Sequence, residues 1–490
     1  MEKRVLLATV LSLGFLFLWQ YLTYRPQEQK MQQVESEYKN KEQKEEIQQK
    51  MGFYEPYIVE TERLKLVFNK YGAGIREIYI KENSAQEYTL LCKDSQDSLF
   101  VSSEVKFDVK EIEGEKHSVS FIAKDISVQY IFPKDNPYKI NVDISVSKPK
   151  RFEFMLQHYI HSDRFSEEPN VVHICKLVKA DNKDMMLVEK VNKTELTKRD
   201  DLFWIAVGDK YYFVGIIFPK LPIDVKVEKK TKNVKQLVFA PSETVRKFNY
   251  ELLIAPKKIS LLTSFGNKFI HTVEWGTFAP LSKLFYNILT YFYKLFGNYG
   301  VAIIGLTLVT QIFTFPLTLN SIKATIKMKK LQPQIQLLQK VYKDDPKRLN
   351  MEIMNLYKEK KVNPFGGCLP LLLQIPIFWA LFTMLRNTYD LRGASFILWI
   401  KDLSSPDKLV IPGTNFGIPV LVLLMGISML IQQILSGAFK DPQQKTFAIM
   451  MPVIFTVLFI NFPSGLVLYW FINNLFSIVL QVVVSRTTEV

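Results

Sequence analysis

The residue types that could do chemistry in the apolar part of this sequence are amides and hydroxyls, spaced at helical intervals. The apolar run from Val301 to Asn320 carries four of them on one helical face, at i, i+4, i+7 and i+11: Thr307, Gln311, Thr314 and Thr318. Such groups form hydrogen bonds with one another or with water, whereas lipid offers them no partner. The stripe therefore predicts either contact between helices or a hydrated surface inside a membrane.

Polar residues also line up in the later apolar segments. They are Gln374, the pair Ser428 and Gln432, and the series Asn474, Ser477 and Gln481. Ordinary hydrogen bonds between helices, at roughly 0.6 kcal/mol each on average, are the simpler explanation for any single residue. In the topology derived below, however, most of these positions lie from the membrane centre toward the cytoplasm, while the outer halves of the segments are mostly apolar. That distribution predicts a hydrated groove that is open to the cytoplasm and closed on the outer side.

The groups that most membrane chemistry requires are missing from these segments. Between their ends, the last five apolar spans contain no Asp, Glu, Lys, Arg or His, which excludes proton relays, ion pumps and voltage sensors. Aspartyl and metalloproteases are disfavoured for the same reason. No glycine in the chain is followed by lysine, so the phosphate-binding loop of P-loop proteins cannot occur. We therefore expect no catalytic residue, no metal and no cofactor, in a protein that is not an enzyme.

Apolar runs of membrane length, about 17 to 25 residues, organise the chain of 490 residues. The first follows Lys3 and Arg4 and lacks a small-residue cleavage site, so residues 1–24 are expected to be a transmembrane signal anchor with a cytoplasmic amino end. Residues 25–50, rich in Gln, Glu and Lys, are expected to be a polar linker.

Residues 51–266 show the period of two that is typical of antiparallel strands. Leu64, Leu66 and Phe68 alternate with polar neighbours, and residues 126–132 repeat the pattern. Because Gly, Pro and Asn separate these short strands, we expect an antiparallel β-sandwich domain. The orientation of the anchor places this domain outside the cytoplasm.

Residues 267–297 are expected to contain an amphipathic helix that lies in the outer membrane interface. Lys283 and Lys294 fall on one face of this helix, opposite an apolar face that includes Phe285 and Leu289. The alternative is a helix packed into the core of the β-domain.

Residues 298–490 are expected to form a helical core of five spans, near 299–319, 364–386, 418–436, 446–462 and 464–485. With the anchor they make six transmembrane helices and place both termini in the cytoplasm. Between Ser321 and Asn363 there are eleven Lys or Arg against four Asp or Glu. The rule that cytoplasmic loops are positively charged agrees with this orientation.

The cytoplasmic residues 321–361 are expected to form a helical hairpin, because apolar residues recur at intervals of three and four on both sides of the sequence KDDP. Within it, Asp345 can cap the second helix and Pro346 can begin it. The basic residues are either a solvated surface or a docking site for ribosomal RNA, an acidic partner or anionic lipid. The docking candidates are Lys323, Lys327, Lys330, Lys347 and Arg348. Of the net charge of +15, this segment beside the membrane spans carries +7, so no DNA partner is expected.

Two segments of the core closely resemble the YidC-type membrane protein insertases of bacterial inner membranes. They are KVNPFGGCLPLLLQIPIFWALF, residues 361–382, and MPVIFTVLFINFPSGLVLYWFINN, residues 451–474, and FPLT at residues 315–318 agrees with them. The resemblance implies a five-helix insertase core and a periplasmic β-supersandwich domain. It also implies insertion and folding of nascent membrane proteins in the lipid bilayer, alone or with the Sec translocon. A ribosome or a targeting receptor is left open as a partner of the hairpin.

One position departs from the family pattern. The family commonly carries an arginine in its groove, four residues after the threonine that matches Thr307 and five before the proline that matches Pro316, and this chain has Gln311 there. Attraction of acidic substrate residues by a fixed positive charge is therefore not expected. The family's aromatic contact site falls on Tyr469 and Trp470, which are equally suited to an outer interfacial belt.

The sequence thus predicts ATP-independent insertion of membrane proteins through a groove lined by Thr307, Thr310, Gln311, Thr314, Gln374, Ser428, Gln432, Tyr469, Trp470, Asn474 and Ser477. Two alternatives belong to other classes. A solute transporter would need a pathway that closes alternately, and a membrane-anchored periplasmic sugar-binding protein would place its function in residues 51–266. A disulfide between Cys92 and Cys175 is left open.

Overall fold

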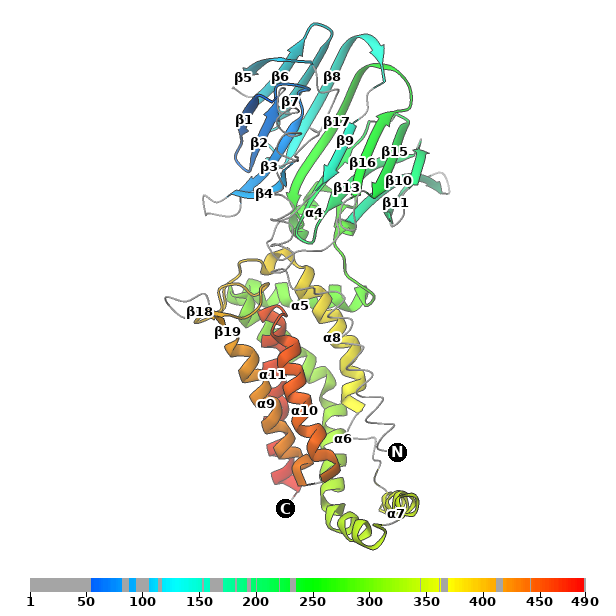
Figure 1. Cartoon of the computed structure of the whole chain (residues 1–490), viewed down its shortest axis with the longest axis vertical. Coiled ribbons are helices and arrows are strands. Elements are labelled where there is room, and N and C mark those ends of the chain that lie inside the picture. Colours follow the sequence, from blue (N-terminus) through cyan, green and yellow to red (C-terminus); the bar gives the residue numbers. More distant parts are fainter. Residues whose placement is uncertain are drawn as a thin grey trace, which may run out of the picture. The chain divides into compact units, whose positions relative to one another are not determined.

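A computed structural model describes residues 54–81, 88–93, 105–112, 117–151, 154–158, 171–180, 183–191, 195–199, 201–219, 221–229, 235–343, 345–360, 362, 369–410, 417–440 and 442–488. The expected signal anchor 1–24 and polar linker 25–50 lie outside these residues. The chain divides into two compact units at Val273 and Glu274, and each is described separately (Figure 1).

The first unit contains a nine-stranded antiparallel sheet. Its strands, in spatial order, are β11 (Lys183–Val191), β10 (Val171–Ala180), β13 (Leu202–Gly208), β14 (Tyr212–Ile217), β17 (Val245–Pro256), β8 (Lys139–Lys150), β7 (Ile126–Phe132), β6 (His117–Ala123) and β5 (Asp108–Ile112). Most strands that are consecutive in this order are joined by hairpins, so the sheet needs few long connections.

Two four-stranded antiparallel sheets contain the other strands that the structure describes in this unit. One consists of β1 (Pro56–Glu60), β2 (Leu64–Asn69), β3 (Ile75–Lys81) and β4 (Tyr88–Lys93), and the other of β12 (Glu195–Arg199), β15 (Ile223–Lys229), β16 (Lys235–Pro241) and β9 (Phe154–His158). The short helices α4 (Ile259–Phe265) and η2 (Phe269–Thr272) follow the last strand.

Aromatic side chains join each small sheet to the large one. The ring of Phe68 on β2 lies 4.7 Å from that of Tyr130 on β7, and the ring of Phe154 on β9 lies 5.3 Å from that of Phe248 on β17. All four side chains are buried, as the alternation of apolar residues along the strands requires. The antiparallel β-domain predicted from that alternation is confirmed.

Cys175 on β10 is a free thiol that is fully buried. The disulfide with Cys92 that the sequence left open is therefore not formed. Burial raises the pKa of the Cys175 thiol from its ordinary value of 9.0 to about 11, because the thiolate would lose its hydration.

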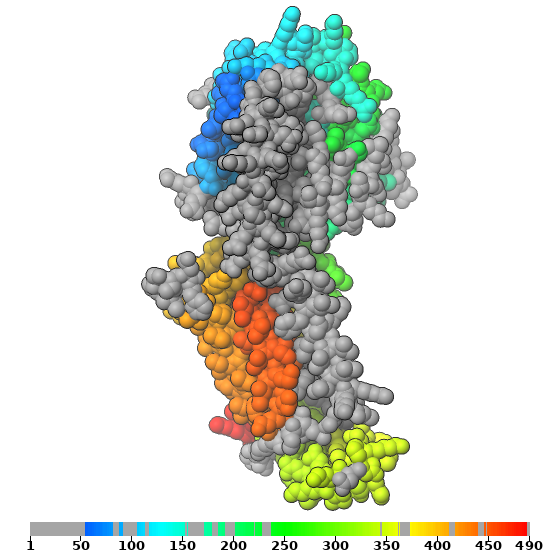
Figure 2. Space-filling model, viewed as in Figure 1, coloured from blue at the N-terminus to red at the C-terminus, as the bar shows by residue number. Residues whose placement is uncertain are grey.

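The second unit is helical. Its helices are α5 (Ala279–Phe296), α6 (Tyr299–Val341), α7 (Pro346–Glu359), α8 (Leu369–Asn387), α9 (Val420–Ser436), α10 (Pro442–Phe459) and α11 (Ser464–Thr488). Short elements connect them: η3 (Tyr389–Leu391), β18 (Leu409–Val410), β19 (Gly417–Ile418) and η4 (Ala438–Lys440). In Figure 1 the long axis of α5 runs across the direction of α6, α9, α10 and α11. Figure 2 shows α10 lying along α9 on the visible face.

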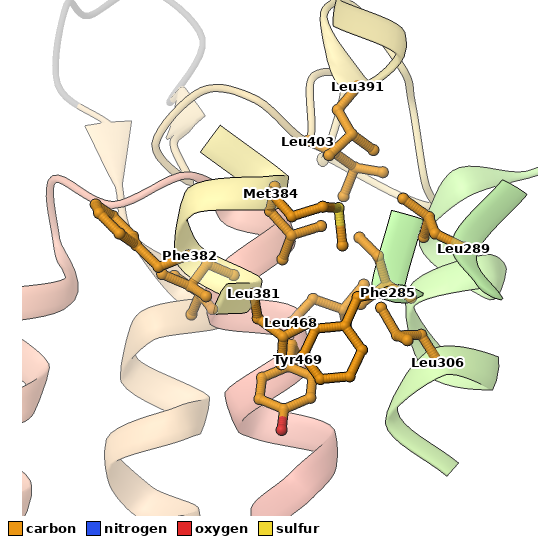
Figure 3. Packing of buried hydrophobic residues seen from close by; sticks show 14 of the residues in the cluster. Phe285, Leu289, Leu306, Leu381, Phe382, Met384, Leu391, Leu403, Leu468 and Tyr469 are labelled. Carbon is orange, nitrogen blue, oxygen red and sulfur yellow. The ribbon is translucent and has the colours of Figure 1, made fainter. Parts of the chain in front are cut away.

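One apolar cluster holds the helical unit together (Figure 3). Phe285 and Leu289 of α5 belong to it, together with Leu306 of α6, Leu381 of α8 and Leu468 of α11. The apolar side of α5 therefore packs on the helical unit. The alternative in which this helix joins the core of the β-domain is wrong.

Helix α6 is longer than expected. The sequence suggested a span ending near Leu319 and a separate hairpin helix, whereas the structure has one continuous helix from Tyr299 to Val341. The sequence changes from apolar to polar at residue 320, but this change does not end a helix. Residues 317–332 contain neither glycine nor proline, so the helix continues through them.

Two of the described helices, Tyr299–Val341 and Ser464–Thr487, are long and apolar enough to cross a membrane, and Val420–Ser436 and Ala448–Phe459 are shorter apolar helices.

Candidate substrate groove and basic surface

Helices α6 and α11 are joined by a polar contact in the middle of their apolar segments. Gln311 on α6 donates a hydrogen bond through Nε2 to Oδ1 of Asn473 on α11, and both side chains are partly exposed. One turn later on α11, Ser477 Oγ donates to the Asn473 carbonyl oxygen at 2.9 Å. The amides thus satisfy each other in part and retain an accessible surface.

A second contact joins α9 to α11. Asn474 Nδ2 donates to Ser428 Oγ at 3.1 Å, and Ser428 Oγ donates to the Met425 carbonyl oxygen at 2.6 Å. Asn474 and Ser428 are both buried, with 5% and 3% of their surfaces exposed. This pair has the properties of a hydrogen bond that fixes two helices against each other.

The third contact joins α8 to α11. Gln374 Nε2 donates to the hydroxyl oxygen of Tyr469 at 3.0 Å, and the Tyr469 hydroxyl also forms a hydrogen bond with the side chain of Thr310 on α6. Tyr469 is buried, whereas Gln374 is partly exposed. One tyrosine hydroxyl therefore connects side chains from three helices.

The threonines of α6 turn their hydroxyl groups toward their own helix. Thr307 donates to the Ile303 carbonyl at 2.7 Å, Thr310 to the Thr307 carbonyl at 2.8 Å, and Thr314 to the Thr310 carbonyl at 3.0 Å. Thr307 and Thr310 are buried, and Thr314 is partly exposed. Because each hydroxyl already donates within the helix, the buried threonines leave no donor for a ligand.

Gln432 and Trp470 differ from the other candidates. The amide of Gln432 on α9 is partly exposed and has no hydrogen-bond partner within the described part of the chain. Trp470 on α11 is partly buried and packs its ring 5.2 Å from that of Phe378, 5.5 Å from that of Phe455 and 5.3 Å from that of Phe459. These contacts make Trp470 part of the packing between α8, α10 and α11.

The candidates therefore fall into two groups. The buried group contains Thr307, Thr310, Ser428, Tyr469 and Asn474, and the partly exposed group contains Gln311, Thr314, Gln374, Gln432, Trp470 and Ser477. Helical spacing identifies a common face but does not distinguish these groups, since rotation and tilt of the helix decide how much of that face is covered.

Asn473 was missed in the sequence. Asn474 begins a polar series with Ser477 and Gln481, and Asn473 stands at i, i+4 and i+8 with the same two residues. That second series was the available signal. The structure uses both asparagines, Asn474 toward α9 and Asn473 toward α6.

The basic residues lie on the last part of α6 and on α7. Buried Leu331 and Ile335 of α6 pack with Ile353 and Leu356 of α7. Helix α7 begins as expected, with Pro346 in its first turn and the side chain of Asp345 accepting a hydrogen bond from the Arg348 N–H at 3.0 Å.

All five docking candidates are exposed: Lys323, Lys327, Lys330, Lys347 and Arg348. The guanidinium of Arg348 lies 5.5 Å from the centre of the Tyr342 ring. Among the described residues from 321 to 360, the one ion pair joins neighbours, Lys360 and Glu359. These five basic residues are therefore not neutralised by carboxylates within the described part of the chain.

No group of three or more His, Cys, Asp or Glu side chains that could hold a metal ion occurs among the residues that the structure describes.

Two family models match the chain. The model described as 60Kd inner membrane protein matches residues 291–489, and the YidC periplasmic domain model matches residues 57–288.

A membrane protein insertase YidC of Endomicrobium trichonymphae is 35% identical over 517 residues, covering 99% of this chain and 98% of the relative. One of Syntrophobacter fumaroxidans is 40% identical over 312 residues, covering 60% of this chain and 56% of the relative. A crystal structure of an active YidC insertase with its first transmembrane domain resolved is 20% identical, with a TM-score of 0.43, and the match covers 86% of this chain and 91% of that one.

Proposed function

We propose that this chain, which belongs to the YidC family of inner membrane proteins, is a membrane protein insertase and chaperone. It is an inner membrane protein with a β-rich periplasmic domain and a helical core. The observation that carries the proposal beyond family membership is the set of uncharged, partly exposed amides on α6, α8 and α9, Gln311, Gln374 and Gln432, in apolar segments without ionisable side chains.

Insertion needs no nucleotide and no covalent intermediate. Each Leu, Ile, Phe or Val contributes about −0.3 to −0.6 kcal/mol on entering the bilayer, so a segment of roughly twenty such residues gains on the order of 5 to 10 kcal/mol. The barrier is the polar flank of the substrate, which must leave water. A surface of amides within the membrane lowers that barrier by offering hydrogen bonds or water where lipid offers neither.

The two groups of candidates have different roles in this proposal. The partly exposed group, apart from the packed Trp470, lines a groove that is open to the cytoplasm. The buried group holds the helices of its wall, through the Asn474–Ser428 bond at 3.1 Å and through Tyr469, whose hydroxyl oxygen accepts a hydrogen bond at 3.0 Å from the partly exposed Gln374. Because Gln311, at the position where the resemblance implies an arginine, is neutral, the groove acts through hydration and hydrogen bonding.

The proposed topology has six transmembrane helices: the anchor 1–24, α8, α9, α10, α11 and the first part of α6. Both termini and residues 321–361 are then cytoplasmic, and α5 lies in the outer interface. The end of α6 and α7 form the helical hairpin, whose exposed basic residues receive the substrate from a ribosome or a targeting receptor. The Sec translocon is a proposed partner for larger substrates.

A photo-crosslinking amino acid at Gln311 tests this function. During synthesis of a short membrane protein, we expect an adduct between the crosslinker at residue 311 and the nascent chain. The matched position is Leu308, on the same helix and exposed but outside the polar stripe, where a weaker adduct is expected. Adducts only to α11, with none to the nascent chain, would show that the contact is structural.

Complementation provides a second test. Expression of this chain in cells depleted of their own insertase should restore growth. Growth should persist in large part when residues 51–266 are deleted and be lost when the helical unit is disrupted. The opposite result would place the function in the β-domain.

A further inference from the structure

Two neighbouring apolar side chains project from the segment between α8 and α9. Ile397 is 54% exposed and Leu398 is 82% exposed. Leu398 also has a φ of +55°, in the left-handed region that a bulky residue rarely adopts. A leucine in this conformation gains nothing from packing within the chain, so another environment must account for it.

The residues around this pair form a fixed base. The Phe396 N–H donates to the Ile400 carbonyl at 2.9 Å, and the Ile400 N–H donates to the Ile397 carbonyl at 3.1 Å. Ile400 is buried at 7% exposure, and Trp399 Nε1 donates to Asp407 Oδ1 at 2.7 Å. The backbone therefore turns tightly while its neighbours face inward, and the two apolar side chains are held at the tip.

The base is attached to the start of α6. A Cβ atom added at Gly300 would lie 2.0 Å from the Phe396 ring, so this ring rests directly on the first turn of the helix. Asn298 Nδ2, at the amino end of α6, donates to the Phe396 carbonyl at 3.2 Å. The tip therefore lies at the end of a helix that is long and apolar enough to cross a membrane.

We propose that Ile397 and Leu398 form a lipid wedge that inserts into the boundary between headgroups and acyl chains at the amino end of α6. The inference uses the membrane placement of α6 in the proposed function and adds an anchoring surface to it. Lipid is the occupant because the tip is joined to the residues at which the apolar helix begins. Lys401, exposed just after the turn, supplies a positive charge for a lipid phosphate. The wedge fixes the depth of the helical unit in the bilayer.

Depth-dependent fluorescence quenching tests the wedge in the full chain. The native cysteines are replaced (Cys92→Ser, Cys175→Ala, Cys368→Ala), and Leu398→Cys is labelled with an environment-sensitive NBD dye. The protein is reconstituted in vesicles of phosphatidylethanolamine and phosphatidylglycerol that contain doxyl-labelled lipids. We expect a blue-shifted emission that a doxyl group near the headgroup quenches more strongly than one deep in the acyl chain.

Two control positions separate the wedge from the membrane placement. Val479→Cys, on an exposed position of α11, should be quenched by the deep doxyl group, and Lys124→Cys, exposed between β6 and β7, by neither. Quenching at 479 without quenching at 398 overturns the wedge and leaves the proposed function standing. Absence of quenching at both positions overturns the membrane placement itself. If the dye at residue 398 is not quenched and this residue crosslinks to a second copy of the chain, the tip lies in a protein interface and the wedge is overturned.

Leu398→Gly distinguishes anchoring from folding. Glycine adopts positive φ without the steric cost of leucine, so the thermal unfolding temperature in detergent should stay equal or rise. In vesicles, a dye at Ile397→Cys should be quenched less when Leu398→Gly is also present. Unchanged quenching in this double variant would show that Leu398 does not hold the tip in lipid.

Discussion

Gln311 on α6 donates a hydrogen bond to the side chain of Asn473 on α11. The position at which the resemblance implies an arginine is thus occupied here by a neutral group with a neutral partner. Both side chains remain partly exposed. The bond accounts for the conformation of Gln311, and the remaining surface accounts for the proposed contact with substrate.

The first prediction concerns hydration at residue 311. Gln311→Leu should reduce insertion of a short membrane protein several-fold, because the leucine offers neither water nor substrate a hydrogen bond. Gln311→Asn keeps the amide and should reduce insertion less. Insertion into proteoliposomes, measured by protease protection, checks the order of the two variants.

The control for this prediction is the partner residue. Asn473→Leu removes the same hydrogen bond and leaves the Gln311 amide free. If the bond only holds α6 against α11, both leucine variants should lose about 0.6 kcal/mol of stability and the same insertion activity. Equal losses of activity would therefore contradict a role for hydration.

The second prediction concerns the buried Asn474–Ser428 pair. A double-mutant cycle with Asn474→Ala and Ser428→Ala should give a coupling energy of about 0.6 kcal/mol, and not above roughly 1.7 kcal/mol. Unfolding in mixed detergent micelles measures it. A coupling energy of zero would mean that the 3.1 Å contact does not fix α9 to α11.

The third prediction concerns the contact between α9 and α10. A Cβ atom at Gly426 would lie 2.1 Å from Thr456 Oγ1, so Gly426→Ala should destabilise the helical unit by about 1 to 3 kcal/mol. Adding Thr456→Ala removes the clashing oxygen and should recover most of the loss. Thr456→Ala alone is the control, and failure of the double variant to recover stability would place the strain elsewhere.

The fourth prediction concerns the thiol of Cys175. Its pKa of about 11 in the folded chain lies above the value of 9.0 expected after unfolding, so the unfolded chain releases its proton first. Stability should therefore fall as pH rises from 9 to 11, by roughly 1.4 kcal/mol for each unit of pKa difference. The pH dependence of urea unfolding measures this loss, and Cys175→Ala should remove it. Below pH 9 the loss should be absent.

The fifth prediction concerns the exposed basic residues. If the hairpin docks on the ribosome as proposed, replacing Lys323, Lys327 and Lys330 with Gln should weaken this binding. The remaining binding should depend less on salt, because fewer charges are screened. Sedimentation with ribosomes at several salt concentrations measures both effects. The matched variant, Lys445→Gln on α10, is exposed but outside this surface and should behave like the original chain.

Much of the fold was predictable because its periodicities are clear. Strand β2 shows the period of two directly, with Leu64, Leu66 and Phe68 all buried. The continuity of α6 was not predictable in the same way. Composition changes from apolar to basic at residue 320. In a hydropathy pattern, one helix that continues from lipid into water therefore resembles two separate elements.

For the candidate site, the sequence predicted which face of a helix carries the polar residues. Spacing placed Thr307 and Gln311 on one side of α6, but the first is buried and the second is partly exposed. The partners of Gln311 and Asn474 are more than forty residues away in sequence, and no local pattern encodes such a pairing. Helix rotation, which depends on the packing of whole helices, decided which asparagine faces α6.

The continuity of α6 gives the proposed groove a mechanical property. With 43 residues and a rise of about 1.5 Å per residue, the helix is roughly 65 Å long, and it carries Gln311 in its first half and the exposed Lys323, Lys327 and Lys330 in its second half. Pro316 lies between them inside the helix, where its missing N–H makes bending easiest. In the proposed groove, a bend of α6 at Pro316 would therefore transmit a load on the basic half of the helix to the opening at Gln311.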